Sequence, residues 1–237
     1  MDWKSHWNTF PCDVPENDFL RQVGKTVGGQ PISAEQLDTI VRSVIETLDV
    51  RPTDRVLDLC CGNGLIGGAV ARCCERLSAV DYSEPLIRVA RKYHAIANIE
   101  YVYGSVLRLE ELPLRDERYD KIYMYEALQH FSETELPELL HQIEYRAASN
   151  VRILLGSIPD AARLENFYDT PQRQEERRRR IAAGTEAIGT WWRMEDLEQV
   201  CRATGFAMRV LRQPPQLHTH HYRVDVVAER GATCTSV

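Results

Sequence analysis

The feature that most constrains the fold is the stretch from Val56 to Gly68, which reads VLDLCCGNGLIGG. An apolar run leads directly into glycines, and the glycines lead into small and apolar residues suited to a helix. Gly62, Gly64 and Gly67 fit the spacing G-x-G-x-x-G, in which glycine lets the backbone turn sharply and approach a ligand closely. The helix start offers free N–H groups and partial positive charge. The sequence therefore predicts a strand, a tight turn and a helix able to hold a nucleotide-like group.

Two acidic residues make this glycine pattern more specific. Asp58 lies inside the predicted strand, just before Gly62, where a charge is costly without a partner or a role. Asp81 ends the next apolar run, LSAVD, at the spacing of about twenty residues that places a carboxylate beside ribose hydroxyls. A turn without a ligand would leave both acids unexplained.

These segments resemble the first two motifs of the class I, Rossmann-like S-adenosylmethionine-dependent methyltransferases. The matching stretches are VLDLCCGNGLIG and AVDYSEPLIRVAR, and the resemblance covers residues 51–131 well and the remainder in outline. It implies an α/β fold with a doubly wound, seven-stranded, mostly parallel sheet and an antiparallel last strand. It also implies S-adenosyl-L-methionine as the cofactor. Nicotinamide-binding proteins share the glycines, but usually lack the preceding acid and carry the loop nearer the chain start.

The order of predicted elements agrees with such a sheet. Ser33 begins a helix, with Gln36 placed for a capping box. Strands and helices then alternate, with strands at 55–59, 77–81, 99–102, 119–125, 151–155, 206–211 and 222–228 and helices at 64–74, 83–93, 135–145 and 194–203. This alternation favours right-handed crossovers between parallel strands. The final strand follows its predecessor without a helix, so it is expected to be antiparallel.

Residues 1–32 are expected to form an N-terminal arm or lid, and residues 33–237 the methyltransferase domain. The arm is either packed on the domain or closes over the cofactor, with Lys25 near the methionine carboxylate. Within the domain, residues 158–192 form an insertion longer than an ordinary connection, and such length is usually functional. Its aromatic residues suggest a cap over a substrate, whereas the run Arg177–Arg180 beside two glutamates suggests a solvated face.

The resemblance implies a set of cofactor contacts on the strand ends, the glycine loop and the arm. Ser105 stands where the family commonly carries an acid for the adenine amino group. The expected cofactor contacts are Lys25, Asp58, Cys60, Gly62, Asn63, Gly64, Asp81, Tyr82, Ser105, Val106 and Tyr125.

Methyl transfer from a sulfonium mainly requires alignment of the nucleophile, and a hydroxyl nucleophile also gains from a general base. His130, in the loop after the strand at 119–125, is the candidate base; Tyr125 and Glu126 compete for that role, and His130 alternatively packs against or caps the following helix. The expected acceptor contacts are Glu126, Tyr168, Trp191 and His221.

Composition excludes several other functions. The net charge of −6 gives no basic field that would attract nucleic acid or a membrane. Enzymes that methylate the amino groups of nucleic-acid bases carry an Asn/Asp-Pro-Pro-aromatic run after the fourth strand. This chain has Tyr-Glu-Ala-Leu there, at 125–128, so a DNA base is disfavoured as acceptor. Of the seven cysteines, Cys60–Cys61 and Cys73–Cys74 are adjacent pairs rather than C-x-x-C motifs. Reduced thiols and no metal site are therefore expected. The N-terminus lacks an apolar leader, which favours a cytoplasmic protein.

The leading hypothesis is methyl transfer to an oxygen or nitrogen of a small-molecule metabolite. The first alternative is a non-catalytic module that binds the cofactor and serves regulation. The second is a nicotinamide-dependent oxidoreductase.

Overall fold

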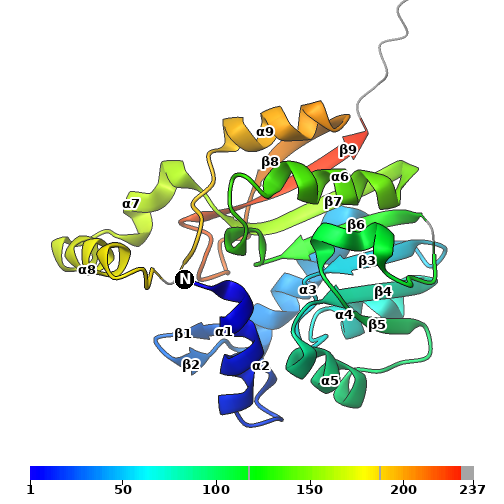
Figure 1. Cartoon of the computed structure of the whole chain (residues 1–237), viewed down its shortest axis with the longest axis horizontal. Helices are drawn as coiled ribbons and strands as arrows, with labels where there is room; N and C mark the ends of the chain where they lie inside the picture. The colour runs from blue at the N-terminus through cyan, green and yellow to red at the C-terminus, as the bar shows by residue number, and fades with distance from the viewer. Residues whose placement is uncertain (117, 187, 231–237) are drawn as a thin grey trace, which may run out of the picture.

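A seven-stranded sheet forms the centre of the computed structural model, which describes residues 1–116, 118–186 and 188–230 (Figure 1). The strands are β3 (Arg55–Leu59), β4 (Arg76–Asp81), β5 (Ile99–Tyr103), β6 (Tyr119–Tyr125), β7 (Ala147–Pro159), β8 (Phe206–Arg212) and β9 (Arg223–Arg230). Their order is β5-β4-β3-β6-β7-β9-β8. Strands β3 to β7 are parallel, and β9 lies antiparallel between β7 and β8. The predicted fold class, including the antiparallel last strand, is confirmed.

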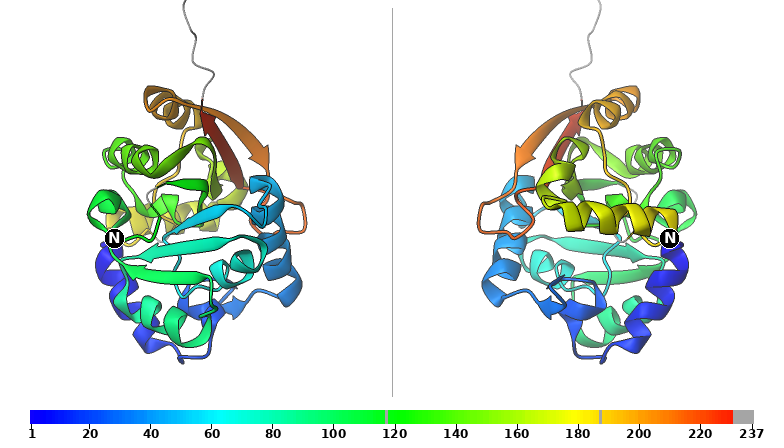
Figure 2. Two further views of the ribbon diagram at one scale, coloured as in Figure 1. Left: turned by 90° about the vertical axis from the view of Figure 1, so that its right-hand side faces the viewer. Right: turned by 90° about the vertical axis from the view of Figure 1, so that its left-hand side faces the viewer.

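Helices cover both faces of the sheet, as Figure 2 shows. One apolar cluster packs η3 (Val106–Glu111), α6 (Leu136–Arg146) and α9 (Met194–Ala203) on one face. A second cluster packs α3 (Ala34–Leu48), α4 (Gly67–Val70) and α5 (Glu84–Tyr93) on the other. Because both faces are covered, β3 and β4 are buried almost throughout, which explains their continuous apolar runs.

Local signals set most helix starts, with two differences from expectation. Ser33 caps α3 by accepting a hydrogen bond from the Gln36 N–H at 3.2 Å. The Gln36 side chain does not complete a capping box, because its oxygen instead contacts His218 Nδ1 at 2.7 Å. The helix predicted over 64–74 is reduced to α4 and a 3₁₀ turn, Ala71–Cys73, and it begins with two glycines, which are poor helix formers.

The N-terminal arm lies beside the carboxyl ends of the parallel strands (Figure 1). It comprises α1 (Trp3–Thr9), η1 (Phe10–Asp13), α2 (Phe19–Gln22) and the two-stranded β1 (Thr26–Val27) and β2 (Gln30–Pro31). The sequence did not predict α1. Helix α1 has no buried residue and therefore lacks the apolar periodicity that reveals a helix.

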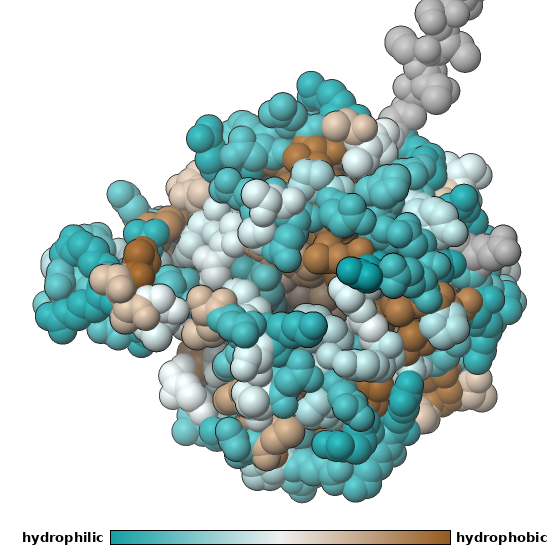
Figure 3. Space-filling view, in the orientation of Figure 1, coloured by the Kyte–Doolittle hydropathy of each residue, from teal (hydrophilic) through white to brown (hydrophobic). Residues whose placement is uncertain are grey.

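The insertion between β7 and α9 contains η5 (Ala161–Arg163), α7 (Leu164–Phe167) and α8 (Pro171–Ala182). Helix α8 has no buried residue and projects from the body as a largely hydrophilic element (Figures 1 and 3). Its arginines pair with acids one turn away, such as Arg180 with Glu176, as a solvated face predicts. No helix in the described ranges combines the length and the apolar character needed to cross a membrane.

Candidate functional site

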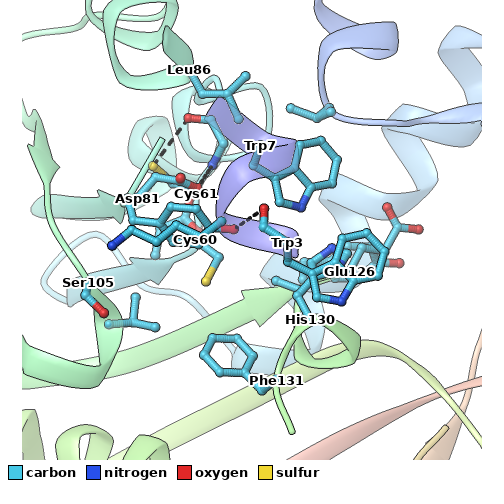
Figure 4. A pocket seen from close by; sticks show the side chains of 18 of the residues that line it. Trp3, Trp7, Cys60, Cys61, Asp81, Leu86, Ser105, Glu126, His130 and Phe131 are labelled. Carbon is cyan, nitrogen blue, oxygen red and sulfur yellow. Dashed lines mark hydrogen bonds between the residues drawn. The ribbon is translucent and has the colours of Figure 1, made fainter. Parts of the chain in front are cut away.

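A cavity of about 750 Å³ lies at the carboxyl ends of β3, β4, β5 and β6, beneath α1. Figure 4 shows its two sides. We call one the glycine-loop side, defined by Cys60, Gly62, Asp81 and Ser105. We call the other the Glu126 side, defined by Lys25, Glu126, His130 and Trp3. Ligands of open α/β sheets bind at such strand ends, so the topology alone makes this the expected site.

Backbone conformation and close packing explain why the glycine loop needs glycine. Gly62 and Gly64 have φ values of +56° and +79°, a region that side chains rarely enter. A Cβ on Gly64 would come within 2.5 Å of the Tyr101 hydroxyl. A Cβ on Gly67 would come within 2.8 Å of Asp58 Oδ2. The glycines therefore allow the turn and also let the loop pack against its own strand.

Asp81 organises the glycine-loop side. Its Oδ2 accepts the Gly62 N–H and its Oδ1 accepts the Ser83 N–H, each at 2.8 Å. Each oxygen keeps further lone pairs, and the residue lines the cavity. Burial raises the carboxyl pKa to about 6, although the backbone donors oppose this. The carboxylate is thus held in place and can accept hydroxyl donors from the cavity.

Asp58 lies on the cavity floor and is 3% exposed. Burial raises its pKa to about 8, and the donor Tyr123, whose hydroxyl lies 2.6 Å from Oδ2, opposes the rise. At neutral pH without a ligand the group is therefore largely protonated. A cationic ligand in the cavity would favour its ionised form.

The remaining residues of the glycine-loop side have partners that limit their roles. Asn63 is fully buried, and its amide donates to the Phe19 carbonyl at 2.8 Å and to Gln22 at 3.0 Å, which ties the arm to the loop. Ser105 caps η3 by accepting the Leu107 N–H at 3.3 Å, so its hydroxyl is only partly free.

On the Glu126 side, an ion pair joins the arm to β6. Lys25 is 7% exposed and its ammonium contacts Glu126 Oε2. Burial alone would raise the pKa of Glu126, but the nearby charges of Lys25 and Arg223 outweigh it and lower the pKa to about 2. Ser157 donates to Glu126 Oε1 at 3.3 Å. Lys25 thus lines the cavity, and its partner there is Glu126.

His130 lies against the aromatic residues of α1. Its ring centroid is 4.2 Å from that of Trp3 and 5.5 Å from that of Trp7. This enclosure, together with the charge of Arg223, lowers the pKa of His130 to about 3. The imidazole is therefore neutral at physiological pH and, with this low pKa, a weaker base than the general base expected from the sequence. Its Nδ1 is buried and has no hydrogen-bond partner among the described residues.

The structure brings most of the predicted site residues to this one cavity. Its lining includes Lys25, Asp58, Cys60, Gly62, Asn63, Asp81, Tyr82, Ser105, Val106, Tyr125, Glu126 and His130. Gly64 is not one of the lining residues, but its positive φ shapes the loop.

Tyr168, Trp191 and His221 are not at this cavity, contrary to the expectation of acceptor contacts. Tyr168 and Trp191 pack with Phe167 and Tyr222, with ring centroids 4.6 to 6.0 Å apart. His221 is exposed beside Tyr222. These aromatics anchor the base of the α7–α8 projection, because a projecting segment needs its own apolar contacts. The insertion lines the cavity through Thr190 alone among its described residues.

Trp3 and Trp7 line the cavity, although the sequence analysis did not identify them as site residues. Their signal was two large aromatics in a polar segment without periodicity, a pattern that suits a ligand-facing helix. Tyr82 donates to the Trp3 carbonyl at 3.1 Å and Ser83 to the Trp7 carbonyl at 2.6 Å. These bonds seat α1 on the end of β4.

Metal ligands do not converge in the described ranges, where no three His, Cys, Asp or Glu side chains form a group. The six described cysteines are free thiols, and burial raises the pKa of both Cys60 and Cys61. Cys234, which the sequence interpretation counted with them, lies outside the described residues.

Comparison with known proteins gives a match in the same region. A family model described as a methyltransferase domain matches residues 56–148. The mitochondrial ubiquinone biosynthesis O-methyltransferase of Schizosaccharomyces pombe is 28% identical over 109 residues, 44% of this chain and 38% of that protein. Ribosomal RNA small subunit methyltransferase A of Geobacter metallireducens is 32% identical over 78 residues, 32% of this chain and 27% of that protein. The matched segments thus span well under half of either relative.

A solved structure is similar over nearly the whole chain. It is the magnesium protoporphyrin IX methyltransferase of Synechocystis with bound SAH, at a TM-score of 0.65 and 15% identity, covering 97% of this chain and 98% of that one. At this identity the likeness shows the fold. The matched methyltransferase domain also contains the glycine loop, Asp81 and Glu126. The chain thus carries a methyltransferase domain with the fold of the class I, Rossmann-like methyltransferases, a family that uses S-adenosylmethionine.

Proposed function

We propose that this protein transfers a methyl group from S-adenosylmethionine to an oxygen or nitrogen of a small molecule. The observation that carries the proposal is a single cavity at the strand ends that joins the glycine-loop side to an ionised carboxylate and a neutral imidazole on the Glu126 side. Such a cavity can hold a cofactor and an acceptor next to each other.

The glycine-loop side fits the cofactor. We assign the ribose hydroxyls to the free lone pairs of Asp81, whose two oxygens each already accept one backbone N–H. Ser105 and Val106 line the wall where adenine is expected, and Asp58 provides a buried acid below a cationic ligand. Contacts from Cys60, Asn63, Gly64, Tyr82, Lys25 and Tyr125 complete the proposed set. When bound, S-adenosylmethionine supplies an activated methyl group.

The Glu126 side suits orientation of the acceptor better than removal of its proton. A carboxyl with a pKa near 2 and an imidazole with a pKa near 3 are both weak bases at neutral pH. Both nevertheless accept hydrogen bonds, and Nδ1 of His130 has no other partner in the described structure. We therefore propose that Glu126 and His130 hold the hydroxyl or amine of the acceptor in line with the methyl. Such alignment can lower the activation barrier by about 7 kcal/mol or more.

The arm, residues 1–32, is proposed as the lid. Trp3 and Trp7 lie over His130, and Lys25 and Asn63 fasten the arm to both sides of the cavity. Movement of part of this arm would open the cavity further to cofactor and acceptor. Closure would then exclude water from the methyl. The insertion at 158–192 is proposed as a secondary wall through Thr190.

The test is a screen of metabolite pools with methyl-labelled S-adenosylmethionine, in which mass spectrometry shows whether O or N gains the label. Calorimetry with S-adenosylmethionine and with NAD should give binding only for the former. A labelled RNA fraction in the same screen distinguishes a nucleic-acid acceptor. Binding without turnover on any pool would favour the non-catalytic module, and binding of NAD instead would favour the oxidoreductase.

A further inference from the structure

Three neighbouring parallel strands end in an unusual backbone conformation. Cys60 follows β3, Glu126 follows β6 and Ser157 lies near the end of β7, and their φ values are +58°, +57° and +58°. Non-glycine residues rarely occupy this left-handed region, which costs about 1–3 kcal/mol per residue and persists where the surroundings enforce it. Since Ser157 donates to Glu126, two of these conformations are directly linked.

Arg223, at the start of β9, contacts the residues that hold Glu126 in place. Its guanidinium is buried, with the residue 6% exposed, and Nη1 donates to the Ser157 carbonyl and to Gln129 Oε1. Gln129 in turn donates from Nε2 to the Glu126 carbonyl at 2.7 Å. One guanidinium therefore fixes both the segment that bonds the Glu126 backbone and the segment that bonds its side chain.

Asp225 supports the same arrangement from the next position but one on β9. Its Oδ1 accepts the Ser157 N–H at 2.7 Å and the Gln213 amide at 3.0 Å. Ser157 is thus held through its N–H by Asp225 and through its carbonyl by Arg223. This double attachment accounts for the strained conformation of Ser157, and hence for the position of the hydroxyl that reaches Glu126.

We infer that Arg223 is a positioning residue for the acceptor: through Ser157 and Gln129 it fixes the carboxylate of Glu126 in the cavity, where that carboxylate receives a hydrogen bond from a neutral or cationic hydroxyl- or amine-bearing acceptor. The inference deepens the proposed function and rests on it for the identity of the site. It assigns a role to a residue outside the cavity lining.

The charges around Glu126 agree with this role. Lys25 from the arm, Arg223 from β9 and His218 from the preceding loop all favour its ionised form, whereas Asp225 opposes it. An ionised carboxylate accepts hydrogen bonds from a hydroxyl or an amine.

The first test needs neither cofactor nor acceptor. The Glu126 side-chain carboxyl is followed by carbon-13 NMR from about pH 3 to pH 8, with assignment through Glu126→Gln. In the wild type the signal should stay at its ionised position. In Arg223→Met its pKa should rise by about 1 to 3 units, the usual effect of a neighbouring opposite charge. Arg230→Met, on the same strand but paired with Glu144, is the matched control and should not shift it.

A conservative variant keeps the inference testable if Arg223→Met does not fold. Arg223→Lys preserves the charge, but the lysine side chain is shorter than the arginine side chain out to Nη1, the nitrogen that donates to both Ser157 and Gln129. The Glu126 carboxyl should therefore stay ionised while acceptor KM rises about tenfold or more, the scale of one lost hydrogen bond to a charged group. Cofactor affinity by calorimetry should be unchanged. An unaltered acceptor KM in Arg223→Lys would overturn the inference.

The decisive measurement combines Arg223→Lys with Glu126→Gln. If Arg223 acts through Glu126, adding Arg223→Lys to Glu126→Gln should cause no further increase in acceptor KM, and equal additive losses would show that Arg223 acts elsewhere. A wild-type protein that methylates nothing in the labelled screen would count against the proposed function alone. An unshifted Glu126 carboxyl in Arg223→Met would count against the inference alone.

Discussion

The two sides of the cavity are assembled in different ways. The glycine-loop side is built from the ends of two adjacent strands, β3 and β4, which are close in sequence. Their ends carry Cys60 to Gly64 and Asp81. On the Glu126 side, the central ion pair joins residues separated by 101 positions, and Arg223 lies a further 97 positions along, since 223 − 126 = 97. The first side depends on local backbone geometry, whereas the second depends on packing between distant segments.

This difference has a chemical counterpart. The glycine-loop side presents backbone N–H groups and one acidic side chain held in place. These features suit a cofactor, which is the same molecule whatever the acceptor is. The Glu126 side presents aromatic rings, a neutral imidazole and a paired carboxylate. Side chains can be exchanged without altering the backbone, so the Glu126 side is where selectivity for the acceptor is expected to reside.

The largest expected effect tests the glycine-loop side. Asp81→Asn keeps the size of the side chain but removes the negative charge, so cofactor binding should weaken by about 2–4 kcal/mol because charge-assisted hydrogen bonds are lost. Calorimetry measures the affinity, with the exposed Glu165→Gln as control. If Asp81→Asn bound the cofactor with undiminished affinity, Asp81 would not be a cofactor-binding residue.

The second prediction concerns the aromatic group at the base of the α7–α8 projection. Trp191 is only half-buried, so Trp191→Ala should cost about 2–3 kcal/mol of unfolding free energy, below the range for fully buried tryptophan. Denaturant unfolding measures this cost, and cofactor affinity should stay at the wild-type value. If stability is unchanged but acceptor KM rises, Trp191 belongs with the acceptor site after all.

The third prediction tests the arm on the Glu126 side. Trp3→Ala removes the ring that covers His130 and should weaken cofactor binding by about 1–2 kcal/mol through loss of aromatic contact. The loss should appear mainly as faster cofactor dissociation in stopped-flow measurements, because the proposed lid would close after binding. Phe10→Ala, on the same arm but outside the cavity lining, is the control. Equal dissociation rates in all three proteins would contradict a lid role.

The smallest effect concerns His130. Its folded-state pKa of about 3 lies below the usual value of 6.5, so the unfolded chain binds more protons between these pH values and stability must fall as pH drops through this window. At pH 5.5 this loss should be about 1.4 kcal/mol, because pH 5.5 lies one unit below the pKa of the unfolded chain. Chemical unfolding at pH 7.5 and 5.5 checks it, since His130→Gln should lose stability less steeply than the wild type. Identical pH dependence in both proteins would mean that His130 is not enclosed as described.

The sequence by itself determined the sheet, most element boundaries and the glycine-loop side. Glycines at Gly62 and Gly64, an acid at Asp81 and alternating apolar runs act through the backbone over short distances, so their consequences can be deduced from spacing. Tertiary structure alone decided the Glu126 side. The pairing of Lys25 with Glu126, the cover of Trp3 over His130 and the anchoring of Ser157 by Arg223 join segments with no fixed spacing between them. It also decided that Tyr168 and Trp191 support a projection rather than the cavity, because an aromatic residue gives the same sequence signal whether it packs against a ligand or against its own chain.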